Sequence, residues 1–224
     1  PDWDHTKLFM IFGVAEDHDS NPIKMGLGKL KKRGARVIAV NPVRTGYNAI
    51  ADDWVGITPG TDGLFILALI HCLFAAEKID LPYLLRYTNA PFLVNQDKGS
   101  DEYGLFLRDD NGKELVWDRK SKSAKAWDTP DISPELQGDL TANDTPCTPV
   151  FALMANRYIG DEYAPEAVAD RCGIPASRIR AIAGELARVA FEEEVVLDRP
   201  WTDFRGQKHD KMVGRPVAFH AMRG

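Results

Sequence analysis

The sequence predicts an α/β fold in which helices cover a mostly parallel sheet. All five residues between Lys7 and Gly13 are apolar, which is typical of a strand that is buried on both faces. A helix-like segment follows, and a second expected strand extends from Arg36 to Asn41, with four apolar residues between these two. This spacing fits a β-α-β unit, the building block of parallel sheets.

The helix of this first unit has a recognisable beginning, face and end. Pro22 suits the first turn of a helix, where its missing N–H leaves no bond unmade. Ile23, Leu27 and Leu30 recur at helical spacing and form an apolar stripe. Gly34 suits the left-handed position that ends many helices. We therefore expect a helix that begins at Pro22 and stops at Gly34.

A third extended segment, Trp54 to Ile57, leads through a turn into an apolar helix from Asp62 to about Glu77. Thr61 is expected at the N-cap of that helix, and the acid of Asp62 favours its first turn. With the usual right-handed crossovers, these elements build a doubly wound, Rossmann-like and mostly parallel sheet.

The composition changes in the middle of the chain, and this change predicts an insertion at 91–150. Within it, residues 104–117 predict a β-hairpin that turns at Asn111-Gly112, the strongest short hairpin signal. We expect residues 1–90 to form the Rossmann-like nucleotide-binding part. We expect residues 151–224 to return to the same α/β domain.

The last part of the chain predicts a helical pair and two returning strands. The first helix begins at Pro165, and the second, from about Pro175, carries an apolar stripe at helical spacing. Segments 194–197 and 217–220 have strand-like sequences. The helical pair also resembles a DNA-reading helix-turn-helix because a glycine lies between the helices.

The DNA-reading alternative would use Arg178, Arg180 and Arg188 on the exposed side of the second helix. The acidic net charge and the α/β context argue against it, and many helical hairpins share this pattern through packing alone. We prefer the packing interpretation. Paired acids such as Asp52-Asp53 are expected to be solvated or capping groups.

The composition is that of an ordinary globular protein. Of the 224 residues, 44% are hydrophobic and 27% are charged. The net charge of −5 argues against a protein whose main task is to grip phosphate backbones, although it leaves room for a local basic patch. The longest apolar run, Leu64 to Ala76, is too short for a bilayer span. We therefore expect no direct nucleic-acid partner and no direct membrane insertion.

No local pattern predicts catalysis or metal binding within this chain. Cys72, Cys147 and Cys172 lie far apart, without a CxxC pair or a histidine at ligand spacing, so we expect reduced and mostly buried thiols. His18 and His220 lack a nucleophile or carboxylate at a diagnostic spacing. We predict no catalytic residue and no protein metal ligand here.

The ends of the first two strands carry the parts of a nucleotide site. Gly13 ends the first strand where dinucleotide-binding folds carry a GxGxxG turn, but the loop after it is long and acidic. An ordinary NAD site is therefore not expected. After the second strand, Asn41 offers an amide, Arg44 a cation and Thr45 a hydroxyl. A surface turn that merely ends the strand remains the alternative.

The acid of Asp62 makes the interpretation more specific. A carboxylate accepts two hydrogen bonds from the N1–H and exocyclic amine of guanine, a pairing that other common bases do not offer in that form. By analogy with bidentate base contacts, it would discriminate by about 1–3 kcal/mol. The alternative is that Asp62 only stabilises the start of the helix, an interaction that contributes less than about 1 kcal/mol at most exposed sites. Both roles are compatible in one residue.

The order of these segments resembles that of the molybdopterin oxidoreductases of the dimethyl sulfoxide reductase superfamily. The resemblance is carried by the Gly13 loop, 34–45, Ala51-Asp52, 57–62, 67–70, 85–88 and 165–188. It spans most of the chain and is weakest from 89 to 149. A generic Rossmann-like nucleotide-binding enzyme remains a further alternative.

The resemblance implies that this chain binds one of the family's two molybdopterin guanine dinucleotides, the molybdenum cofactor. The implied binding residues are Gly13, Asn41, Arg44, Thr45, Thr61 and Asp62. Those at 41–45 would contact the ribose, phosphate or guanine end, and those at 61–62 would lie near the guanine. The loop after Gly13 departs from the family's common Gly-x-Asn-Pro form.

The family's catalytic subunits are several times longer than this chain. The chain does not begin with Met and stops just after an expected strand, so we expect a fragment that holds cofactor but does not turn over alone. The resemblance implies a 4Fe-4S cluster in the preceding region. It also implies two partner subunits: an iron-sulfur electron-transfer subunit and a membrane anchor subunit. The bacterial compartment, cytoplasm or periplasm, is not specified.

The acidic loop and the hairpin insertion resemble the respiratory branch of this family that handles sulfur oxyanions, such as sulfite, thiosulfate or tetrathionate. In such enzymes an oxygen atom is transferred at molybdenum while two electrons leave through the pterin. The resemblance therefore implies that this chain supports two-electron oxo-transfer chemistry by orienting the cofactor.

Overall fold

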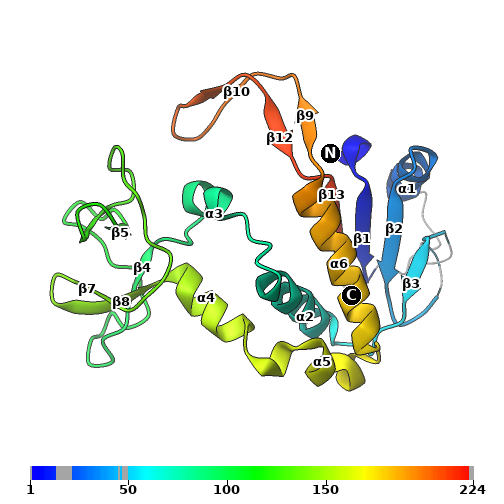
Figure 1. The fold of residues 1–224 in the computed structure, drawn as a ribbon, viewed down its shortest axis with the longest axis horizontal. Coiled ribbons are helices and arrows are strands. Elements are labelled where there is room, and N and C mark those ends of the chain that lie inside the picture. Colours follow the sequence, from blue (N-terminus) through cyan, green and yellow to red (C-terminus); the bar gives the residue numbers. More distant parts are fainter. Residues whose placement is uncertain (1, 14–21, 45, 47–49, 222–224) are drawn as a thin grey trace. The chain divides into compact units, whose positions relative to one another are not determined.

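The computed structural model describes residues 2–13, 22–44, 46 and 50–221. The chain divides into two compact units (Figure 1). The first combines Pro1–Lys78 with Asp161–Gly224, and the second is Ile79–Gly160. The polypeptide therefore leaves the first unit once, builds the second, and returns.

A four-stranded parallel sheet forms the centre of the first unit. Its strands are β1 (Leu8–Phe12), β2 (Arg36–Val40), β3 (Asp53–Val55) and β13 (Val217–Ala221). Their order is β13-β1-β2-β3, and every neighbouring pair is parallel. The predicted α/β fold with a parallel sheet is confirmed.

Helices pack on both faces of this sheet because successive strand residues point to opposite sides. On one face, Phe9 and Ile11 pack against Leu27 and Leu30 of α1 (Pro22–Lys32). On the other, β-strand residues such as Met10 pack against α2 (Asp62–Ala75), α5 (Pro165–Cys172) and α6 (Ala176–Glu192). The helices are thus arranged in a doubly wound layer structure (Figure 1).

The helix limits agree closely with those predicted from sequence. Gly34 follows α1 in the left-handed region, with φ of +83°. None of the helices among the described residues combines the length and apolar character that a bilayer crossing needs. The 3-10 helices η1 (Asp2–His5) and η3 (Asp161–Tyr163) also belong to the described part of this unit.

The segment predicted as a returning strand at 194–197 does not join the parallel sheet. It forms β9 (Val195–Leu197), which pairs antiparallel with β12 (Met212–Gly214). Between them lie β10 (Trp201–Thr202) and β11 (Lys208–His209), also antiparallel (Figure 1). Hydrogen bonding between these neighbouring segments replaces the expected pairing with the central sheet.

The second unit contains an antiparallel sheet that the sequence did not predict. Its strands β4 (Leu93–Asn95), β8 (Thr145–Pro149) and β7 (Leu140–Ala142) lie in the order β4-β8-β7. A separate pair is formed by β5 (Leu115–Asp118) and β6 (Ser123–Ala126). Two helices, α3 (Leu81–Tyr87) and α4 (Val150–Tyr158), flank these strands in the sequence.

The hairpin predicted over 104–117 forms around its turn, and its first arm also pairs with β4. Its turn is where the sequence places it, with Gly112 at φ of +79° and a bridge between Arg108 and Glu114. Across the hairpin, the Leu115 N–H donates to the Leu107 carbonyl over 2.9 Å, while the Leu107 N–H donates to the Leu93 carbonyl of β4 over 2.9 Å. The regular strand pair, β5 with β6, begins within the second arm of the predicted hairpin, at Leu115, and continues beyond it.

Asp118 is the polar centre of the second unit. Its buried carboxylate accepts hydrogen bonds from the Lys125 ammonium at 3.0 Å, the Ser121 hydroxyl at 2.7 Å and the Ser133 N–H at 3.1 Å. The Ser121 hydroxyl, the Lys125 ammonium and backbone N–H groups hold the pKa of this carboxyl well below its usual range.

Replacing Asp118 by Asn should lower the melting temperature of the second unit at neutral pH. Because the folded-state pKa is depressed, the stabilisation is fully present above the unfolded pKa of about 4 and is lost as pH falls further. Thermal unfolding of both proteins, followed by circular dichroism from pH 7 to pH 3, should show the difference shrinking on acidification. Asp128→Asn, at an exposed ion pair with Lys113, is the matched control and should have a smaller effect.

Shortening a buried side chain in the core of the first unit should lower the stability of the fold. Phe65 of α2 is 0% exposed and packs between the sheet and the helices. Phe65→Ala should lower the free energy of unfolding by about 3–5 kcal/mol, measured by chemical denaturation. Ile66, its neighbour on α2, is 39% exposed. Ile66→Ala should cost about 1 kcal/mol or less, and an equal loss for both variants would contradict the described packing.

Candidate functional site

The carboxyl ends of three adjacent strands define the candidate site. Because β1, β2 and β3 are parallel and paired in register, their ends meet at one edge of the sheet. Gly13 follows β1 at φ of +66°, and its N–H donates to the Val40 carbonyl over 3.1 Å. Open parallel sheets bind their ligands outside this edge.

Asn41, at the end of β2, is a buried polar residue that is only 3% exposed. Its side-chain oxygen accepts a hydrogen bond from the Val43 N–H at 3.1 Å. Its own N–H donates to the Val55 carbonyl at 3.1 Å, and its carbonyl accepts from the Trp54 indole at 3.0 Å. Asn41 therefore fixes the turn after β2 against β3.

Arg44 lies on the exposed part of the same turn. Its guanidinium carbon is 5.9 Å from the centroid of the Trp54 ring. Within the part of the chain that the structure describes, no carboxylate pairs with this guanidinium. Thr45 and the loop at 14–21, including His18, lie outside the described residues.

The turn between β3 and α2 carries the last two predicted site residues. Thr61 occupies the N-cap position as expected, but its hydroxyl donates to the Thr58 carbonyl at 2.7 Å and makes no cap bond. Gly60 has φ of +81°, which lets the chain reverse here. Asp62 lies in the first turn of α2 and is half-buried. No described residue donates a hydrogen bond to its carboxylate.

The end of α5 supports this turn. The Thr58 N–H donates to the Cys172 carbonyl at 2.9 Å, and the Cys172 thiol donates to the Thr61 carbonyl at 3.8 Å. Burial raises the pKa of the Cys172 thiol, which favours the protonated donor. Gly173 follows at φ of +69°, and a Cβ there would lie 3.1 Å from the Thr58 hydroxyl oxygen.

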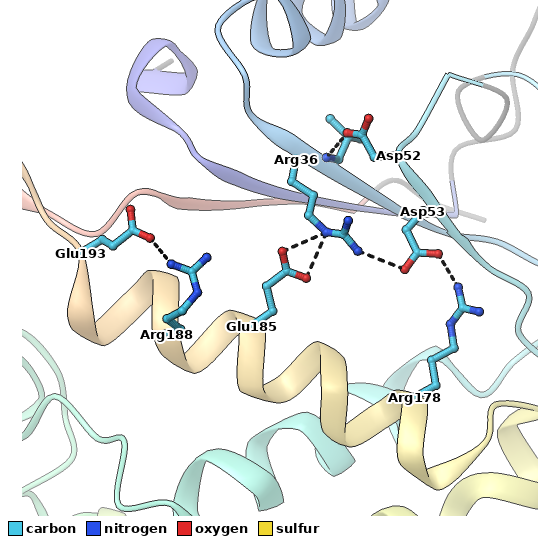
Figure 2. A network of polar contacts seen from close by, with 8 residues as sticks. Arg36, Asp52, Asp53, Arg178, Glu185, Arg188 and Glu193 are labelled. Atoms are coloured by element: carbon cyan, nitrogen blue, oxygen red, sulfur yellow. Dashed lines mark hydrogen bonds and ion pairs between the residues drawn. The ribbon is translucent and has the colours of Figure 1, made fainter.

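A network of ion pairs joins α6 to β2 and β3 (Figure 2). Arg36 contacts Glu185 at 2.9 Å on one side and Asp53 at 3.5 Å on the other. Arg178 pairs with Asp53 and also donates to the Trp54 carbonyl at 2.8 Å. The sequence interpretation of Asp53 as a solvated or capping acid is therefore wrong, because two guanidinium groups bind it.

The neighbouring Asp52 is also a structural acid. It accepts a hydrogen bond from the Val37 N–H at 2.8 Å and pairs with Lys31 at 2.9 Å. Burial raises the pKa of this carboxyl, but the bonds from Lys31 and Val37 outweigh that effect and leave the pKa below its ordinary value.

The arginines considered for DNA reading all have acidic partners. Arg178 pairs with Asp53, Arg180 with Glu166, and Arg188 with Glu193. The hydrogen bond from Arg180 lowers the pKa of Glu166. The apolar stripe of α6 is buried against the sheet. These contacts favour the packing interpretation of the helical pair.

The cysteines, one histidine and the possible metal-binding side chains form a further set of chemical groups. Within 2–13, 22–44, 46 and 50–221, no three side chains of His, Cys, Asp or Glu gather as a metal site. The thiols of Cys72, Cys147 and Cys172 are free, and the latter two are buried. His220 lies in β13 with its ring 5.8 Å from that of Trp3.

Comparisons with known proteins identify the family. No protein-family model matches the chain. The chain is 43% identical over 234 residues to a sulfite dehydrogenase subunit of Allochromatium vinosum, across 100% of this chain and 24% of that protein. The chain belongs to the molybdopterin oxidoreductases of the dimethyl sulfoxide reductase superfamily.

Other members of the superfamily match less closely. A putative dimethyl sulfoxide reductase catalytic subunit of Halobacterium salinarum is 30% identical over 83% of this chain and 22% of its own length. The alpha chain of the perchlorate reductase of Dechloromonas aromatica is 26% identical over 83% of this chain and 24% of its own length. This molybdopterin oxidoreductase chain thus spans about a quarter of the length of the curated relatives it matches.

The fold of this molybdopterin oxidoreductase chain gathers the described candidate residues on one unit. Gly13, Asn41 and Arg44 follow adjacent strands, and Thr61 and Asp62 begin the helix after the third strand. Sequence reasoning missed their supporting residues. The sequence held one indication of such a residue in β3. Side chains alternate along a strand, so Val55 and Ile57 lie in the core and Trp54 points to the opposite face.

The close approach of α5 to the Thr58 turn should make Gly173 intolerant of a side chain. Gly173→Ala should lower the free energy of unfolding by about 1–2 kcal/mol, because alanine resists the left-handed region and would crowd Thr58. Gly184→Ala in α6 is the matched control, since a Cβ there meets nothing within 4 Å. It should stabilise the helix by about 0.5–1 kcal/mol. Chemical denaturation of both variants measures whether the free energy of unfolding falls, as expected for Gly173→Ala, or rises, as expected for Gly184→Ala.

Proposed function

We propose that this chain is the part of a molybdenum oxidoreductase catalytic subunit that binds the guanine end of a molybdopterin guanine dinucleotide. One observation carries the proposal. The ends of β1, β2 and β3 present a left-handed glycine, a cation and a carboxylate at one edge of the sheet. The cation complements a phosphate, the glycine allows a phosphate to approach the backbone, and the carboxylate complements the donor groups of guanine.

The donor set fits the phosphate and ribose of such a nucleotide. Gly13 has no Cβ and leaves its backbone open to close approach. Arg44 has a guanidinium that no described carboxylate neutralises, so it can bind phosphate oxygens through charge-assisted hydrogen bonds. The amide of Asn41 and the hydroxyl of Thr45 are proposed to contact the ribose or base edge.

Asp62 is proposed as the residue that selects guanine. Its carboxylate has no hydrogen-bond donor among the described residues and stands in the first turn of α2. An ionised carboxylate accepts both the N1–H and the exocyclic amine of guanine. Thr61 shapes the turn through its bond to Thr58 and so fixes where α2 begins.

The proposed cofactor supplies two-electron oxo-transfer chemistry at its molybdenum when bound. This chain's residues contribute binding and orientation: they hold the nucleotide end and thereby set the position of the rest of the molecule. A 4Fe-4S cluster and the ligand to molybdenum are proposed for other parts of a full-length protein.

For the whole protein we propose a sulfur oxyanion as substrate, with sulfite as the first candidate. The support is the 43% identity to a protein named as part of a sulfite dehydrogenase. That name also supports partner subunits, of which we propose an iron-sulfur electron-transfer protein and a membrane anchor. Purified full-length complex should transfer electrons from sulfite to an artificial acceptor. Preference for nitrate, perchlorate or dimethyl sulfoxide would contradict the proposed substrate.

The guanine assignment predicts a selective loss on changing Asp62. In the full-length protein, acid hydrolysis should release GMP rather than AMP from the bound cofactor. Asp62→Asn should weaken retention of the cofactor by about 1–3 kcal/mol, because an amide accepts only one of the two guanine hydrogen bonds. The released GMP per protein is measured by chromatography after dialysis.

The matched control is Asp161→Asn, which changes an exposed acid at the first turn of another helical segment. It should retain GMP as the wild type does. Equal retention by Asp62→Asn and the wild type would remove the guanine role of Asp62. Protection of the wild type from heat by NAD would favour a generic Rossmann-like nucleotide enzyme instead.

A further inference from the structure

We propose that Trp54 is a positioning residue that holds the turn at 41–44 in the geometry that binds the nucleotide. This inference rests on the proposed function and adds to it a residue that is not itself a ligand. The Trp54 side chain belongs to β3, whereas the residues it positions follow β2. It therefore links two of the three strand ends that form the candidate site.

The first link is a hydrogen bond. The Trp54 indole N–H donates to the Asn41 carbonyl over 3.0 Å. Asn41 is also bonded to the backbone of β3, since its N–H donates to the Val55 carbonyl over 3.1 Å. The backbone at Asn41 is thus held on both sides at the point where β2 ends.

The second link is the contact with Arg44. The guanidinium carbon of Arg44 lies 5.9 Å from the centroid of the Trp54 ring, within the range of a cation–π interaction. Arg44 is exposed and has no acidic partner among the described residues, so the indole is the group that restricts its conformations. A restricted guanidinium loses less entropy when it binds a phosphate.

Both the ring and the backbone of Trp54 are in contact with neighbouring residues. Its six-membered ring lies against Gly56, where a Cβ would approach the ring carbon Cη2 to 2.9 Å. The backbone of Trp54 is bound by Arg178 of α6, which donates to the Trp54 carbonyl at 2.8 Å. Arg178 also pairs with Asp53 (Figure 2). The helix α6 therefore reaches the nucleotide turn through Trp54.

The test uses the full-length catalytic protein loaded with its cofactor. Trp54→Phe keeps a ring for Arg44 but removes the indole N–H. Gly56→Ala keeps Trp54 but displaces its ring. Both variants should release GMP-containing cofactor about 3- to 10-fold faster than the wild type during dialysis, as expected for the loss of one hydrogen bond.

The matched control is Trp201→Phe. The Trp201 indole also donates to a backbone carbonyl, that of Lys211, over 3.0 Å, but it belongs to the β10–β11 ribbon. This control should release cofactor at the wild-type rate. The tryptophan emission should differ between loaded and cofactor-stripped protein, and that difference should shrink in Trp54→Phe but persist in Trp201→Phe.

The outcomes separate the two proposals. Wild-type release rates for both Trp54→Phe and Gly56→Ala would overturn the role of Trp54 while leaving the guanine site intact. Equally fast release from Trp201→Phe would also overturn it, because the effect would then be general destabilisation. If the wild-type protein yields no GMP, the proposed function fails, and the inference about Trp54 fails with it.

Discussion

Parallel pairing of β1, β2 and β3 is the constraint on which the rest of the first unit depends. It brings three turns that are distant in sequence to one edge of the sheet. β1 and β2 are buried on both faces, so the pairing is stabilised by α1 on one side and by α2, α5 and α6 on the other. The grouping of the candidate residues is a consequence of this alignment, since no single turn carries all of them.

The helices do more than cover the sheet. The ion pairs of Arg36 and Arg178 fasten α6 to the second and third strands, and the end of α5 supports the turn before α2. Most of these pairs are partly exposed, so each contributes little to stability. Their value lies in geometry, because they fix the strand ends at which the candidate ligands stand.

The sequence predicts those parts of the fold that depend on local patterns. The apolar runs of β1 and β2, the stop at Gly34 and the acidic start of α2 follow from neighbouring residues alone, and the structure has them. The failures involve partners distant in the chain. β9 pairs with β12, and the residues before Asn111 bond to β4, which local alternation does not reveal. For the same reason sequence reasoning proposed Asn41 and Arg44 as site residues but not Trp54, whose proposed role depends on the neighbouring strand.

The pairing of β1 with β13 has a consequence for how the molecule is made. Leu8 is aligned with Val217, so the central sheet is completed by residues that leave the ribosome about 200 residues after the first strand. Until then one edge of β1 has no partner, and such edges invite aggregation. Contacts between distant segments also form slowly. Biosynthesis of this domain therefore includes an interval in which one edge of the central sheet is unpaired and the nascent chain needs protection.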